Sequence, residues 1–241
     1  TGVLTALALV VGSTLLVVGL VRLALVPFAL AFEHRHRRAA PGPAGLGPSW
    51  AEPPLVSVVV PAFDEAVVID NCVRSLLRSD YPRFEILCVD DGSRDDTFDR
   101  MLRLSERHAR VHAVRQENAG KGAALNRGIA LARGEVVLLV DADGVFRPDT
   151  ITRLLRGFRD ARVGAVCGND RPVNLDRVLT RFLALVSHVG TGLMRRALDV
   201  LGCLPVVSGN VGAFRREVLE RTGPLRTDTL AEDLELTWRV H

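Results

Sequence analysis

Residues 135–144 constrain the fold more than any other part of this sequence. They read E-V-V-L-L-V-D-A-D-G, so five apolar residues run directly into two aspartates separated by one small residue. A short, β-branched apolar run indicates a strand covered on both faces, as in a parallel sheet. Asp141 and Asp143 would point the same way at its end, because side chains alternate along an extended chain. Paired carboxylates repel each other, and a hard divalent cation that holds a diphosphate would relieve this repulsion.

Apolar strands alternate with helices along the chain from residue 55 onward. The pattern predicts strands over 55–60, 84–89, 111–114 and 163–167 besides the one at 136–140, with amphipathic helices between them. This alternation indicates an α/β fold with a mostly parallel sheet and right-handed crossovers. Ligands bind at the edge where the carboxyl ends of such strands lie. We therefore expect residues 61–65, Asp91 and the two aspartates to meet there.

The last part of the chain is less regular. Residues 175–201 are apolar but carry several arginines, and we expect a helix that either packs on the sheet, which we favour, or lies near a membrane. Residues 208–212 read S-G-N-V-G and predict a loop that leads into a helix around 214–219. Glu232 and Asp233 stand at the start of a final predicted helix.

The N-terminal segment is apolar enough to cross a membrane. Residues 2–21 contain no charged residue, and about 20 such residues in a helix span a bilayer's hydrocarbon core. A shorter apolar stretch comes after Arg22 and is closed by Pro27, and the basic cluster at 34–38 favours a cytoplasmic position for the rest of the chain. A signal peptide is the less favoured alternative, because the basic residues lie after a long apolar region. We predict a transmembrane helix over 1–32, a basic and then Pro/Gly/Ala-rich linker over 33–54, and one domain over 55–241.

The composition argues against two classes of partner or site. The net charge is +3 and basic residues are interleaved with acids, so no nucleic-acid partner is expected. The four cysteines are far apart, show no metal or redox spacing, and are expected to be reduced. The chain begins at Thr1 rather than Met and stops at His241 within a predicted helix, so we expect it to be a piece of a longer protein.

Six segments resemble, in the same order, the motifs of family 2 glycosyltransferases. They read V-S-V-V-V-P-A-F-D-E, V-D-D-G-S-R-D-D-T, N-A-G-K-G-A-A-L-N-R-G, D-A-D-G, S-G-N-V-G-A-F-R-R and A-E-D-L-E-L-T-W-R. The resemblance covers residues 55–241 and implies a nucleotide-sugar-binding, Rossmann-like fold of the GT-A type. With its N-terminal helix the chain is most similar to processive polysaccharide synthases, especially poly-N-acetylglucosamine synthases, and more distantly to hyaluronan, chitin and cellulose synthases.

The resemblance implies a role for the residues in each motif. The residues implied in substrate binding are Pro61, Ala62, Phe63, Glu65, Asp91, Lys121, Asp141, Gly209, Asn210 and Glu232. The first five of these would hold the uridine of a UDP-sugar. Asp141 and Asp143 would hold a Mg²⁺ or Mn²⁺ that bridges the donor's diphosphate, and Asp233 matches the family's catalytic base. Each also has an ordinary reading: Asp91 as a turn residue, Lys121 as a solvated loop lysine, Asp233 as a helix cap and 208–210 as a plain turn.

The implied chemistry is direct displacement of UDP from the anomeric carbon by an acceptor hydroxyl, which inverts the anomeric centre. A metal neutralises the leaving diphosphate, and a carboxylate takes the hydroxyl proton. The implied enzyme is a metal-dependent, membrane-anchored glycosyltransferase that extends a polysaccharide from a UDP-sugar, with GlcNAc as the expected sugar. Its partners would be that donor, a polysaccharide or lipid-linked acceptor and the cell membrane, with the catalytic domain on the cytoplasmic side.

Three other interpretations stay open. The first is transfer of a single sugar to a lipid such as polyprenyl phosphate or diacylglycerol. A nucleotidyltransferase is disfavoured because such enzymes carry a Gly/Arg-rich loop after the first strand, and a non-enzymatic scaffold is disfavoured because every required carboxylate is present. The family's Q-x-x-R-W segment and further membrane helices, which favour a synthase, would come after residue 241, so this piece could be inactive by itself.

Overall fold

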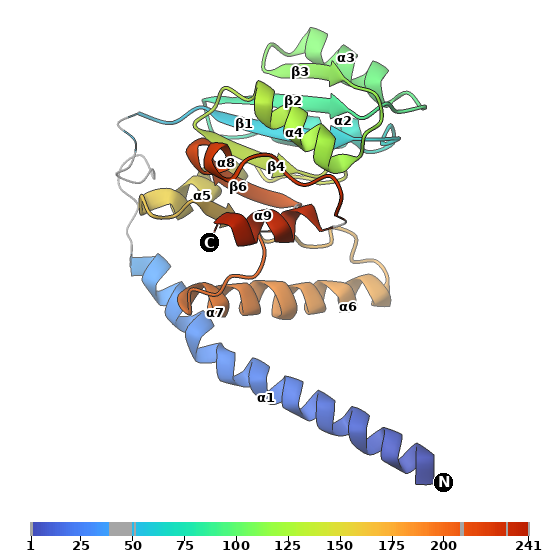
Figure 1. Cartoon of the computed structure of the whole chain (residues 1–241), viewed down its shortest axis with the longest axis vertical. Coiled ribbons are helices and arrows are strands. Elements are labelled where there is room, and N and C mark those ends of the chain that lie inside the picture. The colour runs from blue at the N-terminus through green and yellow to red at the C-terminus, as the bar shows by residue number, and fades with distance from the viewer. Residues whose placement is uncertain (1, 39–49, 51, 208–209, 230, 241) are drawn as a thin grey trace. The chain divides into compact units, whose positions relative to one another are not determined.

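The computed structural model describes residues 2–38, 50, 52–207, 210–229 and 231–240 (Figure 1). Contacts within the chain define two compact units. One comprises residues 1–40 and 169–205, and the other comprises residues 41–168 and 206–241. Residues 169–205, which we expected within a domain over 55–241, therefore group with the N-terminal helix.

The second unit is built on a six-stranded sheet with the order β3-β2-β1-β4-β6-β5. The strands are β1 (Val56–Ala62), β2 (Phe84–Asp90), β3 (Val111–Arg115), β4 (Val136–Val140), β5 (Ala165–Cys167) and β6 (Val211–Arg215). Among the described strands only β6 runs antiparallel to its neighbours, β4 and β5. The predicted α/β fold with a mostly parallel sheet is confirmed.

Strand β6 corrects the prediction that residues 208–212 form a loop leading into a helix around 214–219. Residues 211–215 pair along the whole of β4, and this pairing buries Ala213 and Phe214. Helix α8 (Arg216–Thr222) begins only after the strand. The run V-G-A-F-R is too short for its alternation of apolar residues to identify a strand. It is stabilised by pairing with β4, which lies some seventy residues earlier, so the local sequence does not reveal it.

Helices cover both faces of the sheet. They are α2 (Ile69–Leu77), α3 (Thr97–Arg107), α4 (Lys121–Leu131), α5 (Thr150–Leu155) with the short 3-10 helix η1 (Arg156–Arg159), α8 and α9 (Glu232–Val240). Val58 and alternate neighbours in β1 share a core with Ile69 and Met101 of α2 and α3. Val59 faces the other way, where Gly128 lets α4 approach so closely that a side chain there would overlap Val59. Figure 1 shows α4, α8 and α9 in front of the strands.

Strand β1 continues through Pro61, which we predicted as the start of a turn. Pro61 pairs in register with Val89 of β2, and Ala62 pairs with Asp90. On the other side of β1 the pairing with β4 ends earlier, at Val59 and Leu139. A proline costs no ladder hydrogen bond where its missing N–H would face an unpaired edge, so the strand tolerates it.

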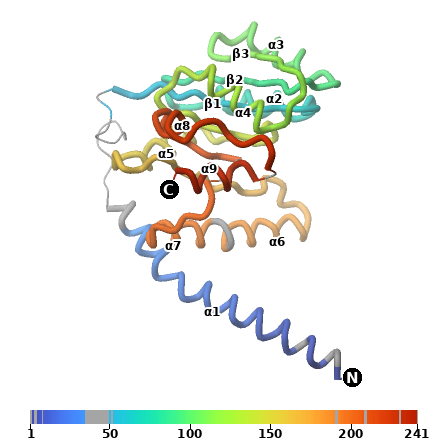
Figure 2. The backbone as a smooth tube through the Cα atoms, viewed as in Figure 1, coloured from blue at the N-terminus to red at the C-terminus, as the bar shows by residue number. Residues whose placement is uncertain are grey.

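The first unit contains α1 (Gly2–Arg38), α6 (Val178–Val186), the π-helical segment η2 (Ser187–Leu193) and α7 (Met194–Val200). Figure 2 shows α7 beside α1. Helix α1 does not stop at Pro27 or at residue 32 but continues through the basic cluster to Arg38. By length and composition, Thr5–His34 is long and apolar enough to cross a membrane. Helix α7 packs against α1, and Arg196 pairs with Glu33 at 3.0 Å.

Helix α6 exposes an apolar surface. None of its residues is buried, and Val178 and Phe182 are 84% and 59% exposed. Packing of this part of 175–201 on the sheet, which we favoured, stays a prediction. The alternative of a helix that lies near a membrane remains open.

Candidate active site

A cleft of about 260 Å³ opens at the carboxyl ends of β1, β2 and β4. It is lined by Pro61, Ala62, Phe63, Glu65, Asp91, Lys121, Ala124, Asp141, Ala142 and Asp143. The parallel strands bring these residues together, although they come from parts of the chain as distant as residues 61 and 143. The convergence that we expected from the strand ends is present in the structure.

Lys121 lies between acids from two different segments. Its Nζ is 2.6 Å from Oδ1 of Asp141 and 3.7 Å from Oε1 of Glu232. Burial by itself would lower the pKa of Lys121, but the hydrogen bond to Asp141 and the surrounding negative charges outweigh it and raise the pKa. Lys121 is therefore a charged, partly exposed side chain that balances Asp141 and links the cleft to the start of α9.

Glu65 adds a further acidic side chain to the cleft, just after the end of β1. Burial raises the pKa of Glu65, and the nearby charges of Asp143 and Asp141 raise it further. Three carboxylates thus act on one another across the cleft, with Lys121 as the cation that contacts Asp141. This excess of negative charge favours a cation as part of the bound ligand.

Asp141 and Asp143 fit a divalent cation that takes its remaining ligands from a phosphorylated substrate. Among the described residues, no three His, Cys, Asp or Glu side chains lie close enough together to hold a metal ion by themselves. Mg²⁺ usually binds one or two carboxylates and completes its shell with substrate phosphates and water. Two carboxylates at the end of one strand, in a cleft with excess negative charge, meet that requirement.

We expect the affinity of the cleft for Mn²⁺ to rise with pH above 4.5, the ordinary pKa of Glu65. A bound cation would offset the charges of Asp141 and Asp143 that raise the pKa of Glu65, so binding lowers this pKa and releases a proton. By linkage, affinity then increases as Glu65 deprotonates and levels off above its raised pKa. Calorimetric titration with Mn²⁺ over this range measures the slope. Glu65→Gln should reduce the slope, and an equal slope in both proteins would contradict the assignment.

Asp91 anchors the loop that precedes Lys121. It is buried, and its carboxylate accepts hydrogen bonds from Gln116 Nε2 at 2.7 Å and from the backbone N–H groups of Ala119 and Gly120 at 3.0 and 2.8 Å. Gly120 has φ +89°, a conformation that favours glycine. The loop is therefore fixed from β2, and Lys121 begins α4 directly after it. Asp91 lines the cleft, but its contacts within the chain are those of a structural anchor.

The β1–α2 loop is fixed by the next loop along the sheet edge. The N–H of Asp64 donates to Ser93 Oγ at 3.0 Å, and the N–H of Arg94 donates to Asp64 Oδ1 at 2.7 Å. The N–H of Glu65 donates to Thr97 Oγ1 at 2.8 Å. Asp64 has φ +54°, which aspartate tolerates better than most residues. These bonds hold Phe63 and Glu65 at the wall of the cleft.

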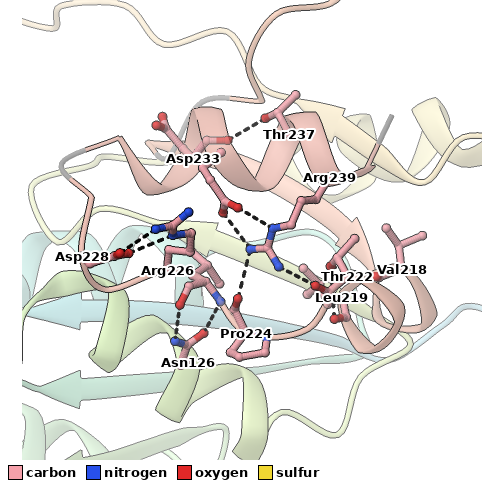
Figure 3. Close-up of polar contacts among 12 residues, drawn as sticks. Asn126, Val218, Leu219, Thr222, Pro224, Arg226, Asp228, Asp233, Thr237 and Arg239 are labelled. Atoms are coloured by element: carbon pink, nitrogen blue, oxygen red, sulfur yellow. Dashed lines mark hydrogen bonds and ion pairs between the residues drawn. The ribbon is translucent and has the colours of Figure 1, made fainter.

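Asn126 is a positioning residue that the sequence did not identify (Figure 3). Its Nδ2 donates to the carbonyl of Leu225 at 2.9 Å, and its Oδ1 accepts from the N–H of Leu225 at 2.7 Å. Arg239 holds the same segment by donating to the carbonyls of Thr222 and Pro224. Helix α4, which begins at Lys121, is thereby joined to the segment that leads into α9. Asn126 lies in the motif around Lys121, but its partner is 99 residues away, so spacing gives no signal for the contact.

We expect Asn126→Ala to lower the free energy of unfolding by about 1–3 kcal/mol, because it leaves both polar groups of Leu225 without their partner. Chemical denaturation measures this change, and hydrogen exchange should show lost protection around 224–229. Arg127→Ala is the matched control, since Arg127 is exposed on the same helix. It should change stability by less than about 0.5 kcal/mol. Equal effects of the two substitutions would show that the Asn126 contact does not hold the segment.

The remaining predicted residues lie at the margin of the cleft or outside it. Glu232 reaches the cleft through Lys121. Asp233 does not line it, but its charge contributes to the raised pKa of Lys121. Its Oδ1 accepts the N–H of Leu234 at 2.8 Å, and Figure 3 shows its carboxylate turned away from Arg239. Asn210 is exposed just before β6 and is not among the lining residues, and Gly209 lies outside the described residues.

Comparison with known proteins identifies a matching family and relatives of the same fold. The model for Glycosyl transferase family 2 matches residues 57–223. Poly-beta-1,6-N-acetyl-D-glucosamine synthase of Staphylococcus epidermidis is 28% identical over 187 residues, which are 77% of this chain and 45% of that protein. The same synthase of Staphylococcus aureus strain COL is 27% identical over the same extent. The chain thus spans about half the length of the curated relatives it matches.

Two solved structures show the fold. The mannosyltransferase PcManGT from Pyrobaculum calidifontis, in complex with GDP-Man and Mn²⁺, matches with a TM-score of 0.65 and 29% identity, over 90% of this chain and 60% of that one. Residues 1–349 of TarS from S. aureus match with a TM-score of 0.55 and 20% identity, over 77% of this chain and 55% of that one.

Proposed function

The chain belongs to glycosyl transferase family 2, and from this we propose that it carries the donor site of a glycosyltransferase that adds a sugar from a nucleotide-sugar to a growing polysaccharide. The observation that carries the proposal is the cleft in which Glu65, Asp141, Asp143 and Lys121 converge at the carboxyl edge of the sheet. A negatively charged cleft that contains one lysine suits a diphosphate that arrives with a divalent metal.

UDP-GlcNAc is the donor that we propose. The support is the name of the curated relatives, which are poly-beta-1,6-N-acetyl-D-glucosamine synthases at 27–28% identity. GDP-mannose is the alternative donor, because PcManGT binds it with Mn²⁺ and is similar over most of this chain. Pro61, Ala62, Phe63, Glu65 and Asp91 would surround the nucleoside in either case.

Each charged residue of the cleft has a proposed task in the transfer. Asp141 and Asp143 would hold a Mg²⁺ or Mn²⁺, which when bound neutralises charge that develops on the leaving diphosphate. Lys121 would exchange its contact with Asp141 for a phosphate oxygen, so that its charge also favours departure of the nucleotide. A carboxylate oxygen of Asp233 would take the proton of the acceptor hydroxyl as that oxygen attacks the anomeric carbon, with inversion. Asn210, with Gly209, would contribute to the acceptor side.

We also propose that the protein is anchored in the cell membrane with the second unit in the cytoplasm. The support is the apolar length of α1, the basic cluster that ends it, and the exposed apolar surface of α6 in the same compact unit. An exposed apolar surface is compatible with a membrane-bound enzyme that extends a polysaccharide, and equally with an enzyme whose acceptor is a lipid. Transfer of one sugar to polyprenyl phosphate or diacylglycerol is therefore the second candidate function.

The test uses the full-length parent protein in lipid nanodiscs with Mg²⁺ or Mn²⁺ and a panel of donors that includes UDP-GlcNAc, UDP-glucose and GDP-mannose. Release of UDP from UDP-GlcNAc together with a long polymer supports the proposed function. A product with one sugar on a lipid supports the second candidate. No release of a nucleoside diphosphate from any donor with either metal would contradict both.

A further inference from the structure

A second cleft, of about 450 Å³, lies between α2 and α3 and shares no lining residue with the first. Four arginines line it, Arg74 from α2 and Arg100, Arg103 and Arg107 from α3. One acid, Asp70, lines it with them. The cleft therefore carries a strong positive charge on a face of the domain that the proposed sugar transfer does not use.

The sequence places these arginines on one stripe. Positions 100, 103 and 107 are spaced by three and four residues, which puts their side chains on the same side of a helix. Met101 and Leu104, between them, are buried, so the stripe lies along the border of the packed face of α3. Helix α2 packs alongside and contributes Asp70 and Arg74, which are also four residues apart.

The positive charge of the cleft is only partly balanced within the chain. Asp70 pairs with Arg100 at 2.7 Å and lies 3.9 Å from Arg74, so one carboxylate serves two guanidinium groups. Arg103 and Arg107 make no ion pair or side-chain hydrogen bond with any residue that the structure describes. Nε of Arg100 is buried and has no hydrogen-bond partner among those residues. Like charges on one helix stripe repel, and a buried donor without an acceptor is unfavourable, so an anion in the cleft would relieve both.

We propose that the cleft between α2 and α3 is a binding site for a phosphate-bearing ligand. A guanidinium group matches the geometry of two phosphate oxygens, and several such groups around one cleft favour a ligand with two or more negative charges. The cleft is open to solvent, so the rest of the ligand can extend outward. The same chemistry is offered by a soluble phosphate ester and by the headgroup of an anionic phospholipid.

The test measures binding of pyrophosphate, without divalent cations, to the full-length protein in phosphatidylcholine nanodiscs. Arg103→Gln/Arg107→Gln should weaken binding at least tenfold. Arg127→Gln/Arg156→Gln removes the same charge from exposed positions outside the cleft and should leave binding within twofold. Equal binding by the two double variants, or no binding by the unmodified protein, would overturn the proposal. Unchanged melting temperatures exclude unfolding as the cause.

A second arm identifies the source of the phosphate. Nanodiscs that contain phosphatidic acid should weaken pyrophosphate binding to the unmodified protein if a lipid headgroup fills the cleft. Equal pyrophosphate binding in both kinds of nanodisc assigns the cleft to a soluble phosphate ester. The donor cleft is tested separately, since binding without divalent cations that depends on Arg103 and Arg107 does not require Asp141 or Asp143.

Discussion

Asp143→Asn in the full-length protein is expected to lower kcat about a thousandfold. The substitution keeps the shape of the side chain but removes one of the two strand-end carboxylates proposed to hold the metal and the donor diphosphate. Charge on the leaving group then develops without its compensating cation, and losses of this order result when such electrostatic stabilisation is removed. The measurement is release of nucleoside diphosphate at saturating donor and Mn²⁺.

Asp149→Asn is the matched control for Asp143→Asn. Asp149 precedes α5, pairs with Arg147 and Arg153 on the surface, and does not line the donor cleft. It should retain nearly full activity, because exposed ion pairs contribute little to stability. If Asp143→Asn kept more than about a tenth of the activity, the carboxylate would not have the role proposed for it.

Asp233→Asn is expected to lower kcat by about a hundredfold to ten-thousandfold while donor affinity changes little. The proposed base acts on the acceptor hydroxyl. Asp233 lies outside the lining of the cleft and reaches Lys121 only through its charge, so its loss should affect the chemical step far more than donor binding. Kinetics with saturating donor and direct titration of the donor separate these two quantities.

Glu232→Gln distinguishes the two acids at the start of α9. Glu232 lies 3.7 Å from Lys121, so its substitution should alter donor affinity through that lysine more than it alters kcat. A large loss of kcat in Glu232→Gln with normal kcat in Asp233→Asn would assign the base to Glu232 instead. The two carboxylates are adjacent in the chain but have different contacts, and this makes the comparison informative.

The cleft at the strand ends could be predicted from local sequence because strands and helices alternate regularly along the chain. Each apolar run ends in polar residues, and parallel topology brings every such end to one edge, so Glu65, Asp91 and Asp141 could be placed together without knowing a distance. The resemblance to family motifs identified Lys121 as a site residue. Its contacts with Asp141 and Glu232, however, depend on how the start of α4 lies relative to the start of α9. That meeting is set by the Asn126–Leu225 hydrogen bonds, which have no local signature.

The predicted bounds of β1 and β6 differ from the observed ones for a common physical reason. Contacts between strands override the local preference of the sequence. Strand β6 forms because β4 offers it an unpaired edge, and Pro61 stays in β1 because β4 no longer pairs there. Residues 169–205 group with α1 because α7 packs on it, and the apolar pattern of the sequence does not show this contact.

Titration of the full-length protein with UDP-GlcNAc, with and without Mn²⁺, tests most directly whether the cleft of Asp141 and Asp143 is a donor site. We predict binding that requires Mn²⁺ and that is much weaker in Asp143→Asn but unchanged in Asp149→Asn. If GDP-mannose bound instead of UDP-GlcNAc, with the same dependence on Mn²⁺ and Asp143, the proposed donor would change but the assignment of the cleft would stand. Binding of either nucleotide-sugar that is equally strong without the metal and in Asp143→Asn would contradict the assignment of this cleft.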